Sequence, residues 1–309
     1  MKTDFQHIGL AKLCAWFGIT RQAYYQNSWK AIDTTIEEEL IIQQIKQIRK
    51  SHRRMGTRKL YEKLQPFMLE HGIKMGRDAL FTIVSANYLQ VRRRKRRIQT
   101  TQSFHWLRKY PNLIRNFVPT APNQLWVSDI TYWKIREDKN VYISFITDAY
   151  SHKIVGYHLA ETLEAIESIK ALKMALLAFK RAESHFQLIH HSDRGIQYCS
   201  KDYVKLLKDY SIQISMIENG DPLENAIAER INGIIKDEYL YDYQVGSIKE
   251  ARELLKAAVE LYNTDRPHMS IGNLTPDKIH QQINNPLKTE KLWKNYYQKK
   301  QLPVNQLQD

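Results

Sequence analysis

The stretch Leu125-Trp-Val-Ser-Asp-Ile-Thr-Tyr-Trp133 decides how the rest of the chain is interpreted. Its aromatic and β-branched residues are typical of a buried strand, and Asp129 interrupts the apolar run. A carboxylate inside a buried strand is costly unless a cation or a hydrogen-bond donor compensates it. Asp129 is therefore a candidate functional residue.

Two further acidic residues can share a site with Asp129. Asp193 ends the strand-like run Phe186-Gln-Leu-Ile-His-His-Ser-Asp193, and Glu229 lies in a predicted helix. Taken singly, an acid at a strand end is more often a turn or cap residue. Two strand-borne carboxylates and one helix-borne carboxylate together are what a divalent-metal site for phosphoryl chemistry needs.

The order of predicted strands and helices indicates a fold in which these acids can lie close together. Strands are predicted at 125–135, 141–147, 153–159, 186–191 and 212–216, and helices at 163–182, 201–210, 222–239 and 248–262. This order predicts an α/β fold with a mixed five-stranded sheet and flanking helices, as in ribonuclease-H-like domains. In that arrangement the first and fourth strands are neighbours, so Asp129 and Asp193 can converge.

The helix that carries Glu229 has two distinct faces. Isoleucines form its apolar side, and its polar side consists of Asn225, Glu229, Asn232 and Lys236. We expect the polar side to face the metal and the DNA. Asp148, at the end of the second strand, is expected to have a structural role. His190 and His191 are expected to support a carboxylate rather than bind Mg²⁺, which prefers oxygen.

The first part of the chain is predicted to be helical. Residues 8–27 suggest a helix-turn-helix in which Gly18 ends the first helix and Thr20 caps the second, presenting Arg21. Helical stretches are also expected at 34–50, after Thr57 with Arg58, and at 71–84. An ordinary helical hairpin is the alternative to a DNA-binding unit.

Charge is distributed unevenly along the 309 residues. Residues 1–120 contain 23 basic and 8 acidic residues, whereas the remainder contains 24 basic and 25 acidic residues. The excess positive charge indicates an N-terminal part that binds a polyanion. A run of six cations is the strongest local feature, and it consists of Arg92, Arg93, Arg94, Lys95, Arg96 and Arg97.

These patterns predict four regions. Residues 1–97 form a helical DNA-binding region, 98–123 a Pro-containing linker, 124–285 the catalytic core, and 286–309 a polar tail. We find no apolar segment long enough to span a membrane and no signal-peptide pattern, so we expect a cytoplasmic protein at the bacterial nucleoid. Cys14 and Cys199 are too far apart in sequence to predict a zinc site.

Several stretches resemble the transposases of the "insertion sequence three" family, whose core is similar to that of retroviral integrase. The matching stretches are Asn123–Tyr132, His191–Tyr198, Asn225–Glu229 with Lys236 and Glu238, Tyr262–His268, and upstream Met55–Arg58. The resemblance runs from about residue 10 to about residue 280. Glu224 and Arg230 depart from the family's usual residues, and the zinc-binding leader of retroviral integrases is missing.

The resemblance implies a catalytic triad of Asp129, Asp193 and Glu229 that binds two Mg²⁺ ions, with Mn²⁺ as a substitute. It implies a transposase that acts on double-stranded DNA, at the transposon ends and at the target, by 3′-end cleavage and strand transfer. A homo-oligomer of two or more copies and a first-frame DNA-binding protein are the expected partners. DNA contacts are also expected from Asn225, Lys236, Arg266 and His268.

Two alternatives remain open at this point. One is a catalytically inactive DNA-binding remnant or repressor of transposition, against which the intact triad argues. The other is a ribonuclease-H-like nuclease that cuts DNA without joining it.

Overall fold

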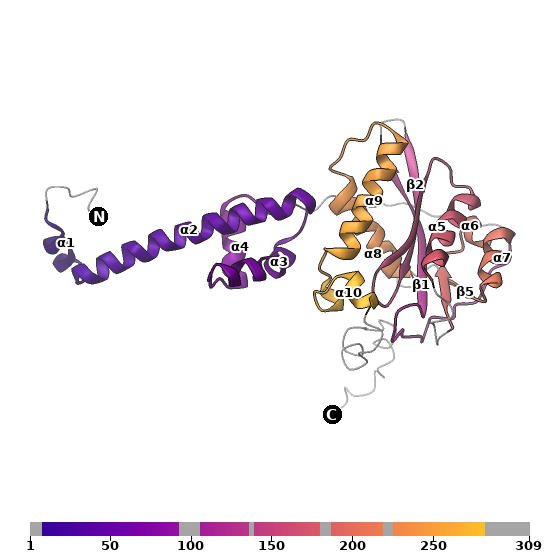
Figure 1. Cartoon of the computed structure of the whole chain (residues 1–309), viewed down its shortest axis with the longest axis horizontal. Helices are drawn as coiled ribbons and strands as arrows, with labels where there is room; N and C mark the ends of the chain where they lie inside the picture. The colour runs from indigo at the N-terminus through magenta and orange to yellow at the C-terminus, as the bar shows by residue number, and fades with distance from the viewer. Residues whose placement is uncertain (1–7, 93–105, 136–138, 180–186, 219–224, 282–309) are drawn as a thin grey trace, which may run out of the picture. The chain divides into compact units, whose positions relative to one another are not determined.

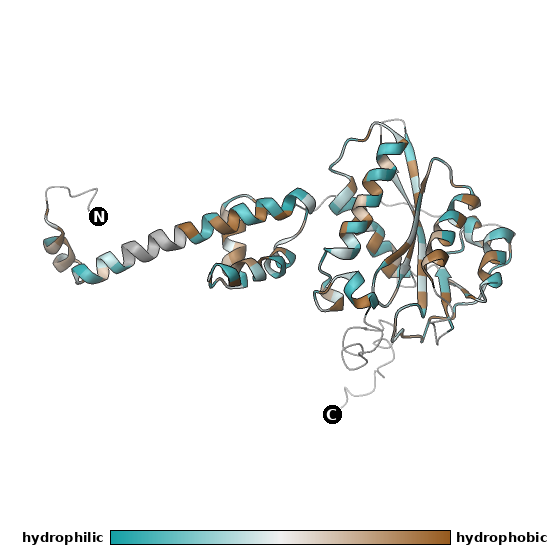
Figure 2. Ribbon diagram, viewed as in Figure 1, coloured by the Kyte–Doolittle hydropathy of each residue, from teal (hydrophilic) through white to brown (hydrophobic). Residues whose placement is uncertain are grey.

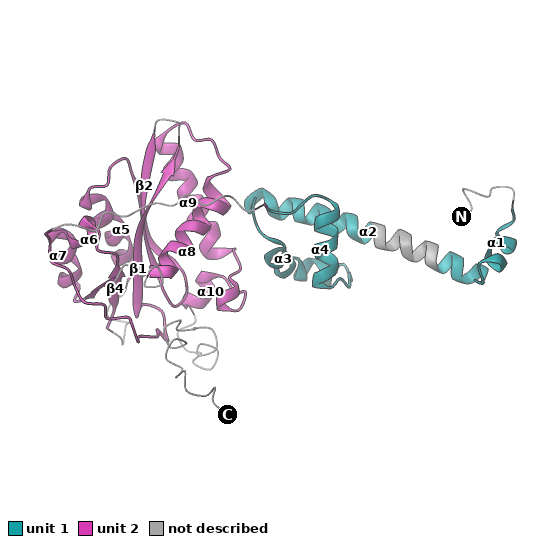
Figure 3. Ribbon diagram, turned by 180° about the vertical axis from the view of Figure 1, so that it is seen from behind, with its two compact units in different colours: residues 1–91 teal, residues 92–309 magenta. Residues whose placement is uncertain are grey.

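The chain forms two compact units, residues 1–91 and 92–309 (Figure 3), in a computed structural model. The structure describes residues 8–92, 106–135, 139–179, 187–218 and 225–281, and within them residues 27–35 by their backbone alone. Each unit has a hydrophobic core of its own.

The first unit begins with the predicted helix-turn-helix boundary. Helix α1 (Leu10–Trp16) is followed by Gly18 at φ 66°, a conformation that favours glycine. Helix α2 (Arg21–Ser51) is capped by Thr20, whose hydroxyl accepts from the Ala23 N–H at 3.0 Å. The expectation that this helix ends near residue 27 is wrong. It continues to Ser51 and absorbs the helix expected at 34–50, because residues 21–51 contain neither Gly nor Pro.

Two shorter helices complete the first unit. Helix α3 (Thr57–Glu70) has Gly56 at its N-cap, so Thr57 is the first helical residue rather than the cap. Helix α4 (Arg77–Ala86) follows the turn at Gly72. Ile41, Ile45 and Leu64 belong to the core that α2, α3 and α4 enclose, and Figure 2 shows apolar residues on the stretch of α2 beside α3 and α4.

The second unit is built on the predicted mixed sheet. Its strands are β1 (Leu125–Lys134), β2 (Asn140–Asp148), β3 (Ile154–Ala160), β4 (Ile189–Ser192) and β5 (Gln213–Met216). They lie in the order β3-β2-β1-β4-β5. Strand β2 is antiparallel to β1 and β3, whereas β1, β4 and β5 are parallel. This is the ribonuclease-H-like arrangement, and β1 and β4 are neighbours as expected.

Helices cover both faces of the sheet (Figure 1). One face carries α5 (Ala165–Ala178), α6 (Ile196–Cys199) and α7 (Lys201–Asp209). The other carries α8 (Ala226–Ile234), the π-helical segment η3 (Ile235–Leu240) and α9 (Ile248–Thr264), followed by the 3₁₀ turn η4 (Met269–Ile271) and α10 (Pro276–Gln281). The sequence did not predict α6, η4, α10 or the change from α- to π-helix.

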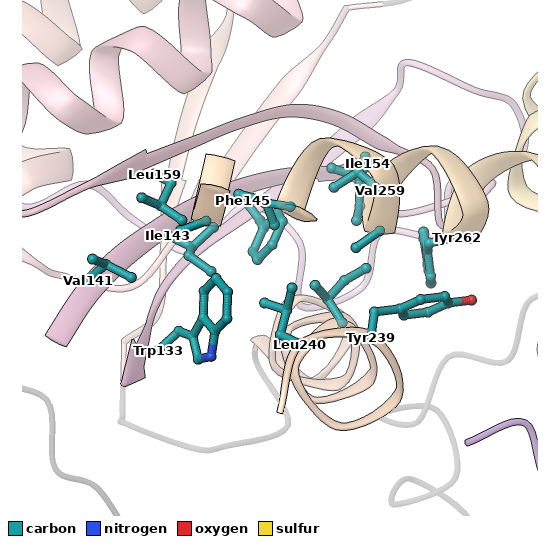
Figure 4. Packing of buried hydrophobic residues seen from close by; sticks show 14 of the residues in the cluster. Trp133, Val141, Ile143, Phe145, Ile154, Leu159, Tyr239, Leu240, Val259 and Tyr262 are labelled. Atoms are coloured by element: carbon teal, nitrogen blue, oxygen red, sulfur yellow. The ribbon is translucent and has the colours of Figure 1, made fainter. Parts of the chain in front are cut away.

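The face that carries α8 has the larger core. Figure 4 shows side chains of β1–β3, such as Trp133 and Phe145, packed against Tyr239, Leu240 and Tyr262 from η3 and α9. All five are at most 4% exposed. Burying large aromatic and aliphatic side chains is the main source of stability here, and it fixes the helix that carries Glu229 on β1.

The segment expected as a linker belongs in part to the second unit. The Asn112 and Leu113 N–H groups donate to Glu218 Oε1 and Ser215 Oγ, both at 2.9 Å, and Met216 N–H donates to the Pro111 carbonyl. Residues around 111–113 are therefore fixed alongside β5 rather than loosely linking the units. Residues 93–105 and 282–309, which include Arg93–Arg97 and the expected polar tail, lie outside the described residues.

Candidate active site

The register of the sheet brings Asp129 and Asp193 to neighbouring positions. Strands β1 and β4 are parallel, with Ser128 opposite Ser192, so the two aspartates are the next residues along each strand direction. On β1, Leu125 and Val127 face the cluster that includes Ala228 of α8. Because side chains alternate along a strand, Asp129 is on this same face.

Two asparagines on the polar side of α8 donate to β1, whereas the sequence predicted that this side faces the metal and the DNA. The Asn225 amide donates to the Ser128 carbonyl at 3.2 Å, and the Asn232 amide donates to Asp129 Oδ2 at 2.7 Å. Further along, Lys236 Nζ lies 5.2 Å from the centre of the Tyr132 ring. Glu229 lies between the two asparagines on the helix and is exposed. The third acid thus comes from the helix that covers the strand of the first.

The three acids are electrostatically coupled. Burial raises the pKa of Asp129 to about 8, together with the negative charges of Asp193 and Glu229. Two hydrogen bonds oppose this shift, from the Ile130 N–H at 2.9 Å and from Asn232. Carboxylates that repel each other in this way are stabilised by a shared cation.

The donor set suits a hard divalent cation. Carboxylate oxygens are the ligands that Mg²⁺ and Mn²⁺ prefer, and the site supplies three such groups. As the chain stands, no three His, Cys, Asp or Glu side chains within the described ranges are gathered closely enough to hold a metal ion. The metal-binding role of Asp129, Asp193 and Glu229 therefore stays a prediction.

Gly195 controls the position of the Asp193 carboxylate. Its N–H donates to Asp193 Oδ1 at 2.9 Å, and a Cβ added at Gly195 would lie 2.9 Å from that same oxygen. Any larger residue would have to displace the carboxylate. Gly195 is a site residue that the sequence analysis did not single out, although it lies inside the stretch that carried the resemblance.

The two histidines beside Asp193 are part of the interior. His190 Nε2 lies 3.0 Å from the Tyr203 hydroxyl, and His191 Nδ1 lies 2.9 Å from the Ser215 hydroxyl. Burial lowers the pKa of His190 to about 3, so its imidazole is neutral. For His190, the expected carboxylate partner is replaced by a tyrosine hydroxyl.

Three of the residues expected to contact DNA are buried instead. Arg266 is 1% exposed, and its guanidinium donates to both oxygens of Glu238 at 2.7 and 2.8 Å. His268 packs with its ring 5.3 Å from that of Tyr262. Asn225 is 6% exposed and donates to β1. Arg266 and Asn225 thus direct their donors to groups inside the protein, and His268 is 6% exposed, so the DNA contacts of these three residues stay a prediction.

The other residues expected to contact DNA differ in their exposure. Arg21 on α2, Arg58 on α3 and Arg92 are exposed, and Lys236 is half-buried beside Asp129. The contacts expected from Arg93, Arg94, Lys95, Arg96 and Arg97 fall on residues outside the described ones. None of the helices in the described ranges combines the length and apolar content that a membrane span needs.

Comparison with known proteins agrees with this architecture. Two Integrase core domain families match residues 119–222 and 210–276. The 31 kDa protein of insertion element IS600 from Shigella sonnei is 34% identical over 281 residues, covering 87% of this chain and 99% of that protein. The transposase of insertion sequence element IS629 from Shigella sonnei is 30% identical over 226 residues, with 73% of each chain covered.

A further relative is the transposase InsF of insertion sequence IS3fB from Escherichia coli K12, which is 33% identical over 185 residues, covering 58% of this chain and 61% of that protein. Among solved structures, the catalytic core domain of HTLV-2 integrase matches with a TM-score of 0.41 and 21% identity, over 52% of this chain and 98% of that chain. The chain belongs to the integrase-core transposases of insertion sequences, the "insertion sequence three" family.

Proposed function

We propose that this protein is a DNA transposase that cleaves the 3′ ends of an insertion sequence and transfers them to target DNA. The observation that carries the proposal is the coupling of Asp129 with Asp193 and Glu229, three acids drawn from two neighbouring strands and the helix above them. Membership of a transposase family supports the same conclusion.

The three acids would hold the metal ions of the reaction. Asp129 and Asp193 offer oxygens from adjacent strand positions, and the exposed side chain of Glu229 can change rotamer to complete the set. Two Mg²⁺ ions, or Mn²⁺ in their place, supply Lewis-acid activation and a clamp for in-line displacement when bound. The mutual repulsion of the acids favours this occupancy.

The chemistry requires no covalent intermediate with the protein. Water attacks the phosphodiester at the transposon end, and the bond to the 3′ oxygen breaks to leave a 3′-hydroxyl. That hydroxyl attacks a target phosphodiester, forming a new bond and releasing a 3′-hydroxyl of the target. The role of the protein is to position DNA and to stabilise the charge at phosphorus.

Basic residues would bind the DNA. Lys236 lies beside Asp129 and would contact the backbone near the scissile phosphate. Arg21, Arg58, Arg92 and the run to Arg97 would bind DNA outside the active site. Joining two ends calls for a homo-oligomer of at least two copies, and a first-frame DNA-binding protein remains a proposed partner. The reaction would take place at the nucleoid in the bacterial cytoplasm.

Labelled transposon-end DNA tests the proposal. With Mg²⁺ and target DNA, the wild-type chain is expected to cleave and join the ends, and Asp193→Asn and Glu229→Gln are expected to do neither while still binding DNA. If the wild type and both variants bind DNA and are equally inert, the protein is a binding-only remnant or repressor. Cleavage without joining would identify a nuclease instead.

A further inference from the structure

In the part of the chain that the structure describes, Asn225 at the N-cap of α8 and Asn232 within α8 each use only half of their side-chain amide for hydrogen bonding. Asn232 and Asn225 are 4% and 6% exposed, and each donates its amide N–H to β1. In each, the side-chain oxygen is buried and has no hydrogen-bond partner among the described residues. Leaving a buried carbonyl oxygen unsatisfied is unfavourable, so the role of each side chain depends on the group to which its amide N–H donates.

Asn263 of α9 shows how a purely structural asparagine is satisfied. It is 8% exposed, its oxygen accepts from the Ile154 N–H, and its amide donates to the Ile154 carbonyl, both at 3.0 Å. Both halves of the side chain are therefore used on the backbone of β3. Asn232 differs because it makes one bond only, and that bond is to the carboxylate of Asp129 rather than to the backbone.

The orientation of the Asn232 amide follows from chemistry. Oxygen and nitrogen of an amide are assigned from the hydrogen-bond network. In the proposed metal-bound site Asp129 is ionised, and turning the amide oxygen toward it would set two acceptors against each other. The N–H therefore points at Asp129 Oδ2, at a distance of 2.7 Å. Ile130 N–H holds the other oxygen of the same carboxylate.

An uncharged donor is well suited to this position. The Asp129 carboxylate lies within the fields of Asp193 and Glu229, which push it away. An ammonium group in place of the amide would neutralise the site and compete with a divalent cation. An amide holds the carboxylate in place without adding positive charge, so the attraction for a cation is retained.

We propose that Asn232 is a positioning residue that holds Asp129 in the orientation in which it binds the catalytic metal ions. This inference rests on the proposed function. Asn232 is three residues after Glu229, one turn along α8, so its bond also fixes the helix that carries the third acid against β1. Groups that hydrogen-bond to metal-binding carboxylates fix their orientation and thereby affect metal affinity.

Mn²⁺ binding to the full chain, followed by the electron paramagnetic resonance signal of the free ion, tests the inference without relying on activity. Asn232→Leu keeps the side-chain shape and removes the donor. We expect it to weaken Mn²⁺ binding by roughly ten- to a hundredfold, the range typical of groups that orient metal ligands. Asn225→Leu is the matched control, because it removes the same kind of bond to a backbone carbonyl, and we expect the wild-type affinity.

The outcomes distinguish a failure of the proposed metal site from a failure of the proposed role of Asn232. If Asp129→Asn binds Mn²⁺ like the wild type, the proposed metal site is wrong. If Asp129→Asn loses the ion and Asn232→Leu does not, only the role of Asn232 is wrong, and equal losses in Asn232→Leu and Asn225→Leu would show a general loosening of α8 instead. Where Asn232→Leu lowers the melting temperature, Asn232→Ser removes the amide at smaller size and must show the same weakening.

A kinetic measurement supplies a second readout. A positioning defect is expected to raise the Mg²⁺ concentration needed for end cleavage while leaving KM for DNA unchanged. Cleavage by Asn232→Leu should therefore recover toward the wild-type rate as Mg²⁺ is raised, whereas Asp129→Asn should not recover. A fall in cleavage that Mg²⁺ does not relieve would overturn the proposal.

Discussion

Asp129 and Asp148 are buried or partly buried aspartates on adjacent strands, and they have opposite electrostatic states. Burial alone would raise the pKa of Asp148, but hydrogen bonds and the charge of His280, together with hydrogen bonds from Ser151, outweigh it and lower the pKa. Its oxygens accept from the Asn123 N–H at 2.7 Å, the Ser151 N–H at 2.8 Å and the Ser151 hydroxyl at 2.7 Å. Asp129 instead has its pKa raised to about 8.

The difference shows how the fold separates a carboxylate whose charge is compensated from one whose charge is not. Asp148 is surrounded by donors that fix its negative charge, and it joins the ends of β1 and β2 to α10. Asp129 has fewer donors and faces two more carboxylates, so its charge is left incompletely compensated. Burial is common to Asp148 and Asp129. The neighbouring groups decide whether the protein stabilises the negative charge or leaves it to be compensated by a cation.

The largest effect on stability is expected from the compensated carboxylate. Asp148→Asn places an amide among donors that need an acceptor, and it should lower the free energy of unfolding by about 3 to 5 kcal/mol at pH 7. Urea denaturation measures the change. Because the folded pKa of Asp148 is lowered, its stabilisation is present above the unfolded pKa, near 4, and is lost as pH falls below it. The variant should therefore approach the wild type in acid.

Replacing Asp129 is expected to change the stability in the opposite direction. In the metal-free wild type, folded Asp129 holds its proton up to about pH 8 and the unfolded chain loses it near pH 4, so stability falls as pH rises through this window. Asp129→Asn does not titrate and should be more stable than the wild type by several kcal/mol at pH 9, with no advantage at pH 3. Denaturation curves across this range check the sign.

A matched metal addition sharpens the contrast between the two aspartates. If Mg²⁺ binds the folded site as proposed, it should raise the melting temperature of the wild type but not that of Asp129→Asn. A wild-type stability that is independent of pH between 4 and 8, after subtraction of the variant, would contradict the raised pKa.

Two glycines extend the comparison to the backbone. Gly195→Ala brings a Cβ against Asp193 Oδ1, the movable end of a side chain, so we expect a large loss of DNA cleavage with little loss of stability. Gly156 of β3 is the control, because a Cβ there would lie 2.3 Å from the Ala171 carbonyl oxygen of α5. Gly156→Ala should lower the melting temperature strongly, since backbone has to move. Equal melting temperatures for the two variants would contradict this division.

Much of the fold followed from the sequence because its signals are local. Strand patterns, the break at Gly18 and the cap at Thr20 depend on neighbouring residues, and the structure confirms them. The face of α8 with Asn225, Glu229, Asn232 and Lys236 was also predictable from helical spacing. What spacing did not reveal is which of these side chains would be buried and which atom each would contact.

The burial of Arg266 shows why other features escaped prediction. At the end of α9 it looks like any polar helix terminus, and its partner Glu238 lies 28 residues earlier in the π-helical segment. A π-helix has no residue pattern that distinguishes it from an α-helix, and the pair forms only through tertiary packing. The same holds for α2, whose continuity depends on the absence of a break rather than on a positive signal.

The smallest effect is expected from the cation nearest the acids. Lys236 lies beside Asp129, and burial lowers its pKa, so its charge is only partly stabilised by the protein. If it contacts a phosphate, Lys236→Ala should weaken binding to transposon-end DNA and reduce the slope of log Kd against log salt by about 1. Lys205→Ala, which removes an exposed lysine on α7 across the sheet, should leave the slope unchanged. If Lys236→Ala and Lys205→Ala give the same slope of log Kd against log salt, Lys236 does not contact a phosphate. Its role would then lie inside the protein, like that of Arg266.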